Sequence, residues 1–275
     1  MTQRSPASSG IFGWPVAQSK SPLIHRFWLG KLGIDGDYSR FPVHPEQLGA
    51  ALRALPALGL RGVNITVPHK IAVMDHLDTI DASARALGAV NTVSVTPDGR
   101  LAGANTDVDG VLEPTRHLDM RGRAVIIAGT GGAARAAVTA AARAGAGWLT
   151  ILARDAAKAA ALLENTGLPG AVAGLDARWP HADDAVLFCN ATSLGMIGQP
   201  ALPVELGQLP VAATVFDAVY APLETPLLAA ARARGMPVID GLQMLVGQAA
   251  TAFEIFFGAP APRQHDTELR TLLMR

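Results

Sequence analysis

The sequence predicts an α/β fold with two domains, each containing a mainly parallel sheet covered by helices. Short apolar segments alternate with amphipathic helical segments along most of the 275 residues, and such alternation is typical of doubly wound sheets. A glycine-rich turn joins a buried strand to an Ala-rich helix near the middle of the chain. Hydrophobic residues make up 49% of the sequence, which is enough to bury a sizeable core.

Charge and composition favour a small-molecule ligand. The 23 Lys and Arg residues balance the 23 Asp and Glu residues, so bulk electrostatics indicate neither a nucleic-acid partner nor an anionic membrane. No apolar run approaches the roughly 20 residues of a membrane span, and the polar start lacks the apolar core of a secretory signal. The single cysteine, Cys189, lies in an apolar run and fits a reducing compartment. We therefore expect a cytoplasmic protein.

The first segment reads as a leader, a strand, a loop and a helix. About nine Ser-rich residues precede the strand that opens at Ile11. A polar loop with Ser19 and Ser21 follows, and Pro22 suits the first turn of a helix that Ser21 caps. Each serine alone is explained as a cap.

The stretch GVNITVPHK, residues 62–70, predicts a buried strand that stops at a proline and ends on a lysine. Val63 and Ile65 alternate with Asn64 and Thr66 at the period of a strand. Local pattern alone leaves Lys70 either as a solvated residue at a helix start or as a group held in a cleft.

A second set of polar residues is predicted near this strand end. Residues 88–95 form a strand, Pro97-Asp98-Gly99 predicts a hairpin turn, and residues 101–107 return along it. Asn91, Asn105 and Asp107 should then come close together at strand ends, on an antiparallel edge of the sheet.

The segment from Arg123 predicts a dinucleotide-binding unit of the Rossmann type. Four apolar residues form a strand, and Gly129, Gly131 and Ala134 fit the pattern in which glycines make a tight turn and admit a pyrophosphate. The following helix presents its amino terminus to the phosphates. In a strand, turn, helix, strand context the motif is specific.

The end of the next strand discriminates between the two dinucleotides. An NAD site usually has Asp or Glu there, whereas this chain has Arg154, with Lys158 one helical turn on. Two cations favour the 2′-phosphate of NADP. Asp155 is interpreted mainly as the cap of the next helix, although it leaves NAD open as a secondary cofactor.

Polar residues also follow the later strands, at residues 185–191, 214–219 and 237–239. Asn190, Thr192, Asp217, Tyr220 and Asp240 lie at their carboxyl ends, where doubly wound sheets bind ligands. The last long helix, residues 242–257, has an apolar face that Gln248 interrupts. Gln248 is either partly exposed or a ligand contact.

Taken together, several blocks of this chain resemble the shikimate dehydrogenase family. They run from about Ile11 to Phe257, and their order and spacing are specific: GWPVAQSKSPLIH, NITVPHK, GAVNT, GANTD, GTGGAAR, NATSLGM, DAVY followed by ETPLL, and DGLQMLVGQAA. The resemblance implies reversible reduction of 3-dehydroshikimate to shikimate with NADP(H), in the biosynthesis of chorismate and the aromatic amino acids.

The resemblance also implies a role for particular residues. Lys70 and Asp107 would be the catalytic pair at the reacting oxygen. The residues implied to bind substrate are Ser19, Ser21 and Tyr220 for the carboxylate and Thr66, Asn91 and Gln248 for the hydroxyls. The residues implied to bind the cofactor are Gly129, Thr130, Gly131, Gly132 and Ala133 at the pyrophosphate, Arg154 and Lys158 at the 2′-phosphate, and Thr192, Ala218 and Gly241 on the nicotinamide side.

In this family the active site lies between two domains. The resemblance implies a substrate-binding domain of residues 1–108 plus 241–275 and an NADP-binding domain of residues 109–240. The chain departs from the usual family pattern at Trp14, Ala104, Ala153 and Ala218. None of these changes removes a catalytic group, but they leave open an altered substrate or cofactor preference.

Alcohol oxidation needs an acceptor for the proton of the hydroxyl. Lys70 is either a neutral base in oxidation or an ammonium that donates in reduction, and we interpret it as sharing a proton network with Asp107. Two rival functions stay open: a quinate/shikimate dehydrogenase using both NAD and NADP, and a non-catalytic dinucleotide-binding regulator. The seven histidines have no ligand-like spacing, so no metal site is expected. We expect a monomer or a homodimer.

Overall fold

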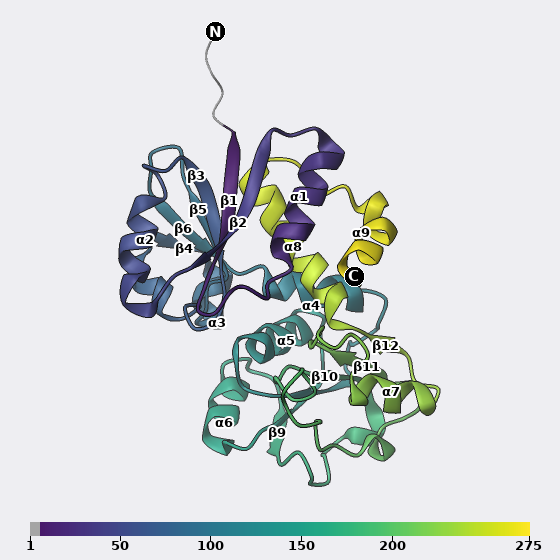
Figure 1. Cartoon of the computed structure of the whole chain (residues 1–275). Coiled ribbons are helices and arrows are strands. Elements are labelled where there is room, and N and C mark those ends of the chain that lie inside the picture. The colour runs from purple at the N-terminus through teal and green to yellow at the C-terminus, as the bar shows by residue number, and fades with distance from the viewer. Residues whose placement is uncertain (1–5) are drawn as a thin grey trace. The chain divides into compact units, whose positions relative to one another are not determined.

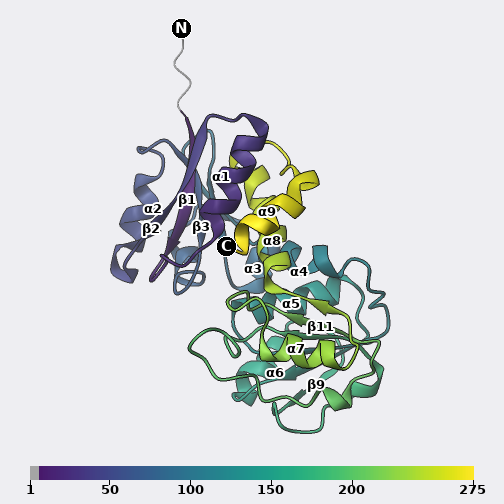
Figure 2. The same cartoon turned by 45° about the vertical axis from the view of Figure 1, so that its right-hand side comes forward.

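The computed structural model describes residues 6–275 and confirms the α/β class (Figures 1 and 2). By contacts between residues the chain divides into two compact units, residues 1–106 with 248–275 and residues 107–247. The functional domains proposed above break at slightly different places, after residues 108 and 240, and their assignment to substrate and cofactor stays a prediction. Among the described residues, no helix is long and apolar enough to cross a membrane.

The first unit is built on a six-stranded sheet of order β2-β1-β3-β5-β6-β4. Its strands are β1 (Ala7–Gly13), β2 (Gly36–Pro42), β3 (Leu60–Ile65), β4 (Thr79–Ile80), β5 (Thr92–Val95) and β6 (Leu101–Ala104). Its helices are α1 (Ser21–Leu32), η1 (Pro45–Gln47), α2 (Leu48–Ala54), η2 (Ala72–His76), α3 (Ala82–Leu87), η5 (Arg263–His265) and α9 (Asp266–Leu273), with part of α8 (Gly241–Phe257). Strands β1, β2 and β3 are parallel, whereas β5 is antiparallel to both β3 and β6, as the hairpin signal predicts.

Helices cover both faces of this sheet. Figures 1 and 2 show α2 on one face and α1, α8 and α9 on the other. The spacing of Leu48, Leu52 and Leu55 in the sequence predicts a helix over residues 46–58, and all three side chains are buried. Helix α2 is shorter than this prediction because the first turn is a 3₁₀ turn and the chain turns again after Ala54.

Three details of the predicted first unit are wrong. Strand β1 begins at Ala7, where the sequence suggests a flexible leader, because its Ala7 and Ser9 side chains are buried; residues 1–5 of that leader lie outside the described residues. Ser21 is the first helical residue of α1 and makes no capping hydrogen bond. Val67 lies beyond the end of β3 and is 68% exposed.

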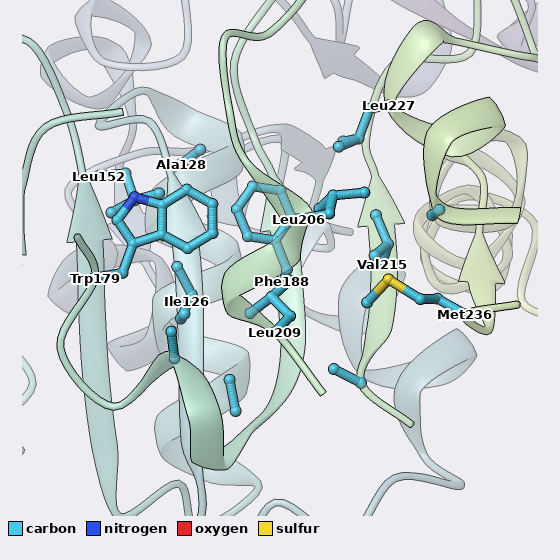
Figure 3. Packing of buried hydrophobic residues seen from close by; sticks show 14 of the residues in the cluster. Ile126, Ala128, Leu152, Trp179, Phe188, Leu206, Leu209, Val215, Leu227 and Met236 are labelled. Atoms are coloured by element: carbon cyan, nitrogen blue, oxygen red, sulfur yellow. The ribbon is translucent and has the colours of Figure 1, made fainter. Parts of the chain in front are cut away.

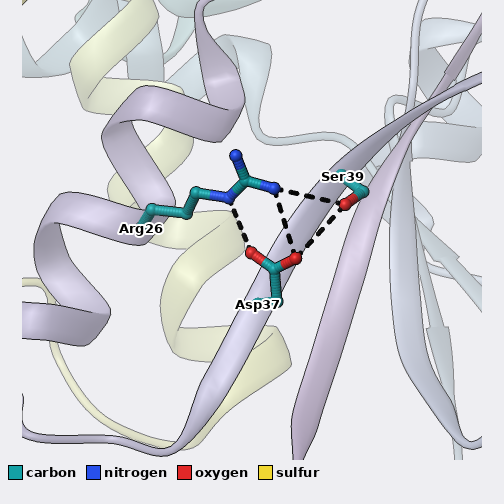
Figure 4. Close-up of polar contacts among 3 residues, drawn as sticks. All are labelled: Arg26, Asp37 and Ser39. Carbon is teal, nitrogen blue, oxygen red and sulfur yellow. Dashed lines mark hydrogen bonds and ion pairs between the residues drawn. The ribbon is translucent and has the colours of Figure 1, made fainter.

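A two-point ion pair fixes α1 against β2 (Figure 4). The Nε atom of Arg26 donates to Asp37 Oδ1 at 2.6 Å and its Nη2 atom to Asp37 Oδ2 at 3.2 Å, while Ser39 Oγ donates to the same carboxylate at 3.3 Å. The hydrogen bond from Arg26 holds the pKa of Asp37 below its usual value. Both partners are half exposed, so we expect the pair to contribute less than about 1 kcal/mol.

The second unit is a fully parallel sheet of order β12-β11-β10-β7-β8-β9, the doubly wound order with its reversal between β7 and β10. Its strands are β7 (Ala124–Ala128), β8 (Trp148–Leu152), β9 (Gly170–Ala173), β10 (Ala185–Asn190), β11 (Thr214–Asp217) and β12 (Val238–Ile239). Its helices are α4 (Asp107–Thr115), α5 (Gly132–Arg143), α6 (Ala156–Glu164), η3 (Ala182–Asp184), η4 (Leu206–Gln208) and α7 (Pro226–Ala233).

One apolar cluster fills a face of this second sheet (Figure 3). The indole of Trp179 stacks on Phe188 with ring centroids 5.4 Å apart, and Ile126 and Val215 from neighbouring strands complete the layer. Cys189, on the same strand as Phe188, is buried as predicted, and burial raises the pKa of its thiol. It is a core residue.

His25 is an unusual member of the core of the first unit. Its imidazole has no exposed surface and stacks on the Tyr38 ring at 4.1 Å with an angle of 2° between the planes, and Phe253 packs on it at 5.8 Å. Within residues 6–275, neither ring nitrogen has a hydrogen-bond partner. Burial lowers the pKa of His25 to about 3, so the imidazole is neutral in the folded protein.

This burial predicts that His25 makes the stability pH dependent. Below about pH 6.5 the unfolded chain binds a proton at His25 that the folded chain excludes, so stability falls as the pH drops toward 3, by about 1.4 kcal/mol per unit. Urea unfolding at pH 7, 6 and 5 should show a weaker decline for His25→Phe, which keeps the ring and loses no hydrogen bond. The exposed His76→Gln is the control, and equal slopes for wild type and His25→Phe would contradict the prediction.

Candidate active site

The polar residues of the first unit gather at one edge of its sheet. Phe12 pairs with Ile65, Asn64 with Thr92, and Thr92 with Ala104. Strands β1, β3 and β6 therefore end, and β5 begins, at the same end of the sheet. The loop after β1, the turn after β3 and the segments before β5 and after β6 meet there, as the sequence predicts for Asn91 and Asn105.

The serines lie together in the loop that follows β1 and at the start of α1. Ser19 Oγ lies 3.2 Å from Ser21 Oγ and accepts from the Ser21 N–H at 3.3 Å, and both residues are buried. Because Ser21 is not a cap, its hydroxyl is available to the site. Arg40 donates its Nε to the carbonyl of Ser19 at 2.9 Å, which fixes the loop and brings a cation beside it.

Both the backbone and the side chain of Asn91 form hydrogen bonds at this end of the sheet. Its carbonyl accepts from the Ile65 N–H at 2.7 Å and its N–H donates to Ala104 at 3.1 Å. Its side-chain Oδ1 accepts from the Thr106 N–H at 2.8 Å. Thr106 Oγ1 in turn lies 3.5 Å from Gln248 Oε1, so the structure brings Asn91 and Gln248 into one group.

A backbone hydrogen bond fixes the position of Lys70. Its carbonyl accepts from the Val90 N–H at 2.8 Å, one residue before Asn91, and its side chain is partly buried. His69 is buried, and its Nε2–H donates to the Val43 carbonyl at 2.8 Å. The predicted helix that begins at Lys70 is a 3₁₀ turn that begins at Ala72. Thr66 sits directly after β3, with its N–H bonded to Phe12 O.

Asp107 and Tyr220 belong to the second unit. Asp107 is the first residue of α4 rather than the end of a strand, and its side chain is buried. Tyr220 follows β11 and is half buried, and burial raises the pKa of its phenol. The first unit therefore gathers Ser19, Ser21, Thr66, Lys70, Asn91 and Gln248, and the second contains the other two.

The glycine turn after β7 has the geometry that its motif predicts. Gly129 has a φ of +118°, and a Cβ atom there would lie 2.9 Å from the carbonyl oxygen of Ala191, beyond β10. Gly131 is the N-cap of α5 and offers no side-chain cap. Ala134 is fully buried, so its small side chain allows close packing of helix and sheet. Thr130, Gly132 and Ala133 complete the turn and the start of the helix.

Beyond β8, the predicted cap at Asp155 is confirmed. Its side chain accepts from the Lys158 N–H at 3.1 Å, and Lys158 Nζ pairs with the same carboxylate at 3.1 Å. The backbone and then the side chain of Lys158 hold the pKa of Asp155 below its usual value. Arg154 is exposed. The carboxylate is thus engaged with its own helix, next to two cations.

A buried carboxylate supports the loops beyond β10 and β11. Asp217 accepts from Thr225 Oγ1 at 2.6 Å, from Asn190 Nδ2 at 2.9 Å and from the Val219 N–H at 3.0 Å. Asn190 Oδ1 then accepts from Thr192 Oγ1 at 2.7 Å. Burial raises the pKa of Asp217. The position of the sequence-predicted Thr192 therefore depends on Asn190 and Asp217.

Close packing accounts for Gly241 at the start of α8. A Cβ atom there would lie 2.5 Å from the carbonyl oxygens of both Ala218 and Val219. The Asp240 carboxylate accepts from the Leu242 N–H at 3.1 Å and so caps the helix. Glycine is required at this position by the backbone that carries Ala218.

Several residues of the site have no assigned role in the sequence analysis. In the first unit they are Tyr38, Asn64, Thr92, Thr106 and Arg40. Asn64 carries the clearest signal, a polar residue inside a buried strand; Tyr38 and Thr106 have none in the local pattern. Within residues 6–275 no group of His, Cys, Asp or Glu side chains could hold a metal ion.

Comparisons with known proteins place these features in a family. Residues 11–93 match the model of the shikimate dehydrogenase substrate binding domain, and residues 241–268 match that of the shikimate 5'-dehydrogenase C-terminal domain. The chain is 51% identical to the shikimate dehydrogenase (NADP(+)) of Sphingopyxis alaskensis, over 96% of both proteins.

Solved structures agree over nearly the whole chain. The shikimate 5-dehydrogenase of Thermus thermophilus in complex with NADP(H) and shikimate is 36% identical, with a TM-score of 0.86 and coverage of 96% of this chain and 98% of that one. The 5-ketofructose reductase of a Gluconobacter species, in its ligand-free form, is 33% identical, with a TM-score of 0.90 and coverage of 98% and 100%. This chain belongs to the shikimate dehydrogenase family.

Proposed function

We propose that this protein is an NADP-dependent shikimate dehydrogenase, which interconverts 3-dehydroshikimate and shikimate in the biosynthesis of chorismate and the aromatic amino acids. The observation that carries the proposal is one end of the first sheet. A buried serine pair lies in the loop after β1, and backbone hydrogen bonds hold Lys70 and the oriented amide of Asn91 at the neighbouring strand ends. A ring with one carboxylate and several hydroxyls matches these groups. Family membership supports the same activity.

Each substrate group has a partner in this proposal. The Ser19 and Ser21 hydroxyls would donate to the carboxylate, with help from Tyr220, because hydrogen bonds to an ionised acceptor are the stronger kind. Thr66, Asn91 and Gln248 would bind the hydroxyls. Arg40, bonded to the Ser19 carbonyl, supplies a positive charge near the serine loop.

The glycine turn fits a dinucleotide. At Gly131 a Cβ atom would meet nothing within 4 Å, so the space above the turn is open to a ligand. The first amides of α5 have no acceptor within their own helix, and no side chain caps them. They would therefore donate to the pyrophosphate, joined by Gly129, Thr130, Gly132 and Ala133, while Thr192, Ala218 and Gly241 would line the nicotinamide side.

NADP, when bound, accepts a hydride from the alcohol carbon or returns it to the ketone. Lys70 and Asp107 would serve the oxygen of the same group, one receiving or supplying its proton and the other stabilising the charge that develops. We propose that the two act as one proton-sharing pair. The buried Asp217–Asn190 network would keep Thr192 in place as the cofactor binds.

We also propose a preference for NADP over NAD. Arg154 and Lys158 would bind the 2′-phosphate, and Asp155 is engaged in capping α6. One assay separates this function from its two rivals: turnover of shikimate and of quinate is measured, each with NADP and with NAD. Activity with shikimate and NADP is expected to exceed the other combinations, and faster turnover of quinate, or no turnover at all, would favour one of the two rivals. Cytoplasmic location and a monomer or homodimer stay predictions.

Replacing Lys70 by Met should reduce kcat by about 10²- to 10⁴-fold with a modest change in KM for shikimate, because the proton is transferred in the transition state. Steady-state kinetics in the oxidation direction measure both values. Lys31→Met on α1 is the control, since Lys31 pairs with Glu268 at the surface. Near-normal turnover of Lys70→Met would instead support the interpretation of Lys70 as a solvated residue without a part in the reaction.

Alanine at the two glycines should separate folding from cofactor binding. Gly131→Ala has space for its methyl group and should cost less than about 1 kcal/mol in unfolding free energy, yet weaken NADP binding at least tenfold. Gly129→Ala should cost about 1–3 kcal/mol because its φ is +118° and a backbone oxygen lies 2.9 Å away. Thermal unfolding and calorimetric titration test both. Unchanged NADP affinity in Gly131→Ala would contradict the placement of the pyrophosphate.

Arg154→Ser should raise the KM for NADP about tenfold or more and leave the KM for NAD within twofold, because NAD has no 2′-phosphate. The matched control is Arg121→Ser, a similarly exposed arginine of the second unit. Equal effects on both cofactors would show that Arg154 contributes something other than phosphate recognition.

A further inference from the structure

The Tyr38 hydroxyl orients an asparagine beside the proposed substrate site. Tyr38 is fully buried in β2, and its Oη donates to Asn64 Oδ1 at 2.6 Å. Asn64 in turn donates to the Asn91 carbonyl at 3.2 Å. The phenol is thereby joined to the group around Asn91, and neither Tyr38 nor Asn64 has a role in the function proposed above.

Two backbone groups fix the direction of the network. The Thr106 N–H can only donate, so the Asn91 atom 2.8 Å from it is Oδ1. The Asn91 carbonyl can only accept, so the Asn64 atom 3.2 Å from it is Nδ2. Turning over either amide would set donor against donor or acceptor against acceptor, at a cost of about 1–3 kcal/mol.

The other hydrogen bonds follow from these two. Asn64 Nδ2 also donates to Thr92 Oγ1 at 3.0 Å, and Thr92 Oγ1 then donates to Asn91 Oδ1 at 2.9 Å. Asn64 Oδ1 can only accept, so Tyr38 must donate to it.

This direction separates supporting residues from binding residues. The three hydrogen-bonding groups of the Asn64 amide are committed to Tyr38, Thr92 and Asn91. Asn64 therefore supports the site without facing a ligand. Asn91 has its oxygen turned inward to Thr92 and Thr106, and its amide nitrogen donates to Thr106 Oγ1 at 3.0 Å.

His25 fixes the ring that carries the hydroxyl. Its imidazole lies parallel to the Tyr38 ring at 4.1 Å, and Phe253 packs on it at 5.8 Å. A ring stacked in a close-packed core has one orientation, so the phenol oxygen stays within hydrogen-bond distance of Asn64 Oδ1.

We propose that Tyr38 is a positioning residue for substrate recognition: its hydroxyl orients Asn64, and through Thr92 the hydroxyl-binding amide of Asn91. The inference rests on the function proposed above. It deepens that function by adding a residue that does not contact the substrate but orients the amide that recognises the ring hydroxyls.

Tyr38→Phe is the direct test, because phenylalanine keeps the ring and its stack on His25 and removes one oxygen. The KM for shikimate should rise about tenfold, as expected for an acceptor left unpaired at Asn64, with kcat lowered less. The KM for NADP should stay within twofold. Thr92→Val breaks the same chain one step further on and should show the same selectivity, which covers the case in which Tyr38→Phe folds poorly.

A control variant and a double variant distinguish a positioning role of Tyr38 from a general loss of stability of the fold. Ser9→Ala removes one buried hydrogen bond from the same sheet, that from Ser9 Oγ to Gly62 O at 2.8 Å, and should lower the thermal midpoint without raising either KM. In an Asn91→Ala background, Tyr38→Phe should change the KM for shikimate less than twofold, because its effect passes through Asn91.

Each outcome has a meaning. Wild-type protein that turns over shikimate, with an unchanged KM in Tyr38→Phe and Thr92→Val, would overturn the role of Tyr38 and leave the proposed function intact. Equal increases in the KM values of shikimate and NADP would overturn it as well, since they indicate loosening of the fold. Wild-type protein inactive on shikimate would overturn the proposed function and this inference with it.

Discussion

The backbone of Asn91 is the constraint on which the first unit depends. Its carbonyl and N–H bond to β3 and to the end of β6, and its side chain accepts from Thr106. A buried peptide group without a partner costs about 1–3 kcal/mol, which is more than the roughly 0.5–1.5 kcal/mol that a made hydrogen bond contributes. The strand ends must therefore meet at this residue, and the polar groups that follow them are brought together as a consequence. The polar groups gather there because the backbone hydrogen bonds of Asn91 join the ends of β3 and β6.

In the second unit a buried carboxylate joins the strand ends in the corresponding way. At the carboxyl ends of β10 and β11 the buried Asp217 accepts from Thr225, Asn190 and the Val219 N–H, which compensates for its removal from water. The loops that carry Thr192 and Ala218 are thereby fixed next to the reversal of the strand order. In both units, buried hydrogen-bonded groups determine where the residues that we propose as ligand contacts lie.

Sequence reasoning found what is encoded locally. The alternation of Val63 and Ile65, the glycine turn at Gly129 and the cap at Asp155 are local patterns, and the structure confirms each. The cap expected at Ser21 is wrong, because a serine before a proline fits both a cap and the first helical position, and the local pattern does not distinguish them. Tyr38 lies 26 residues from Asn64, the residue to which it donates. No local pattern marks such a pair, because its meaning arises only when β1 brings their strands together.

The same network also contains the two points at which the chain passes between its units. The first unit ends at Thr106 and resumes at Gln248, and these two side chains lie within 3.5 Å of each other. Asp107, which we propose as half of the catalytic pair, is the residue that follows Thr106. Because the Thr106 N–H is bonded to Asn91, the peptide leading to Asp107 begins from a fixed point of the first unit. The hydrogen bond that orients Asn91 thus also anchors the start of the segment that carries the proposed acid–base residue.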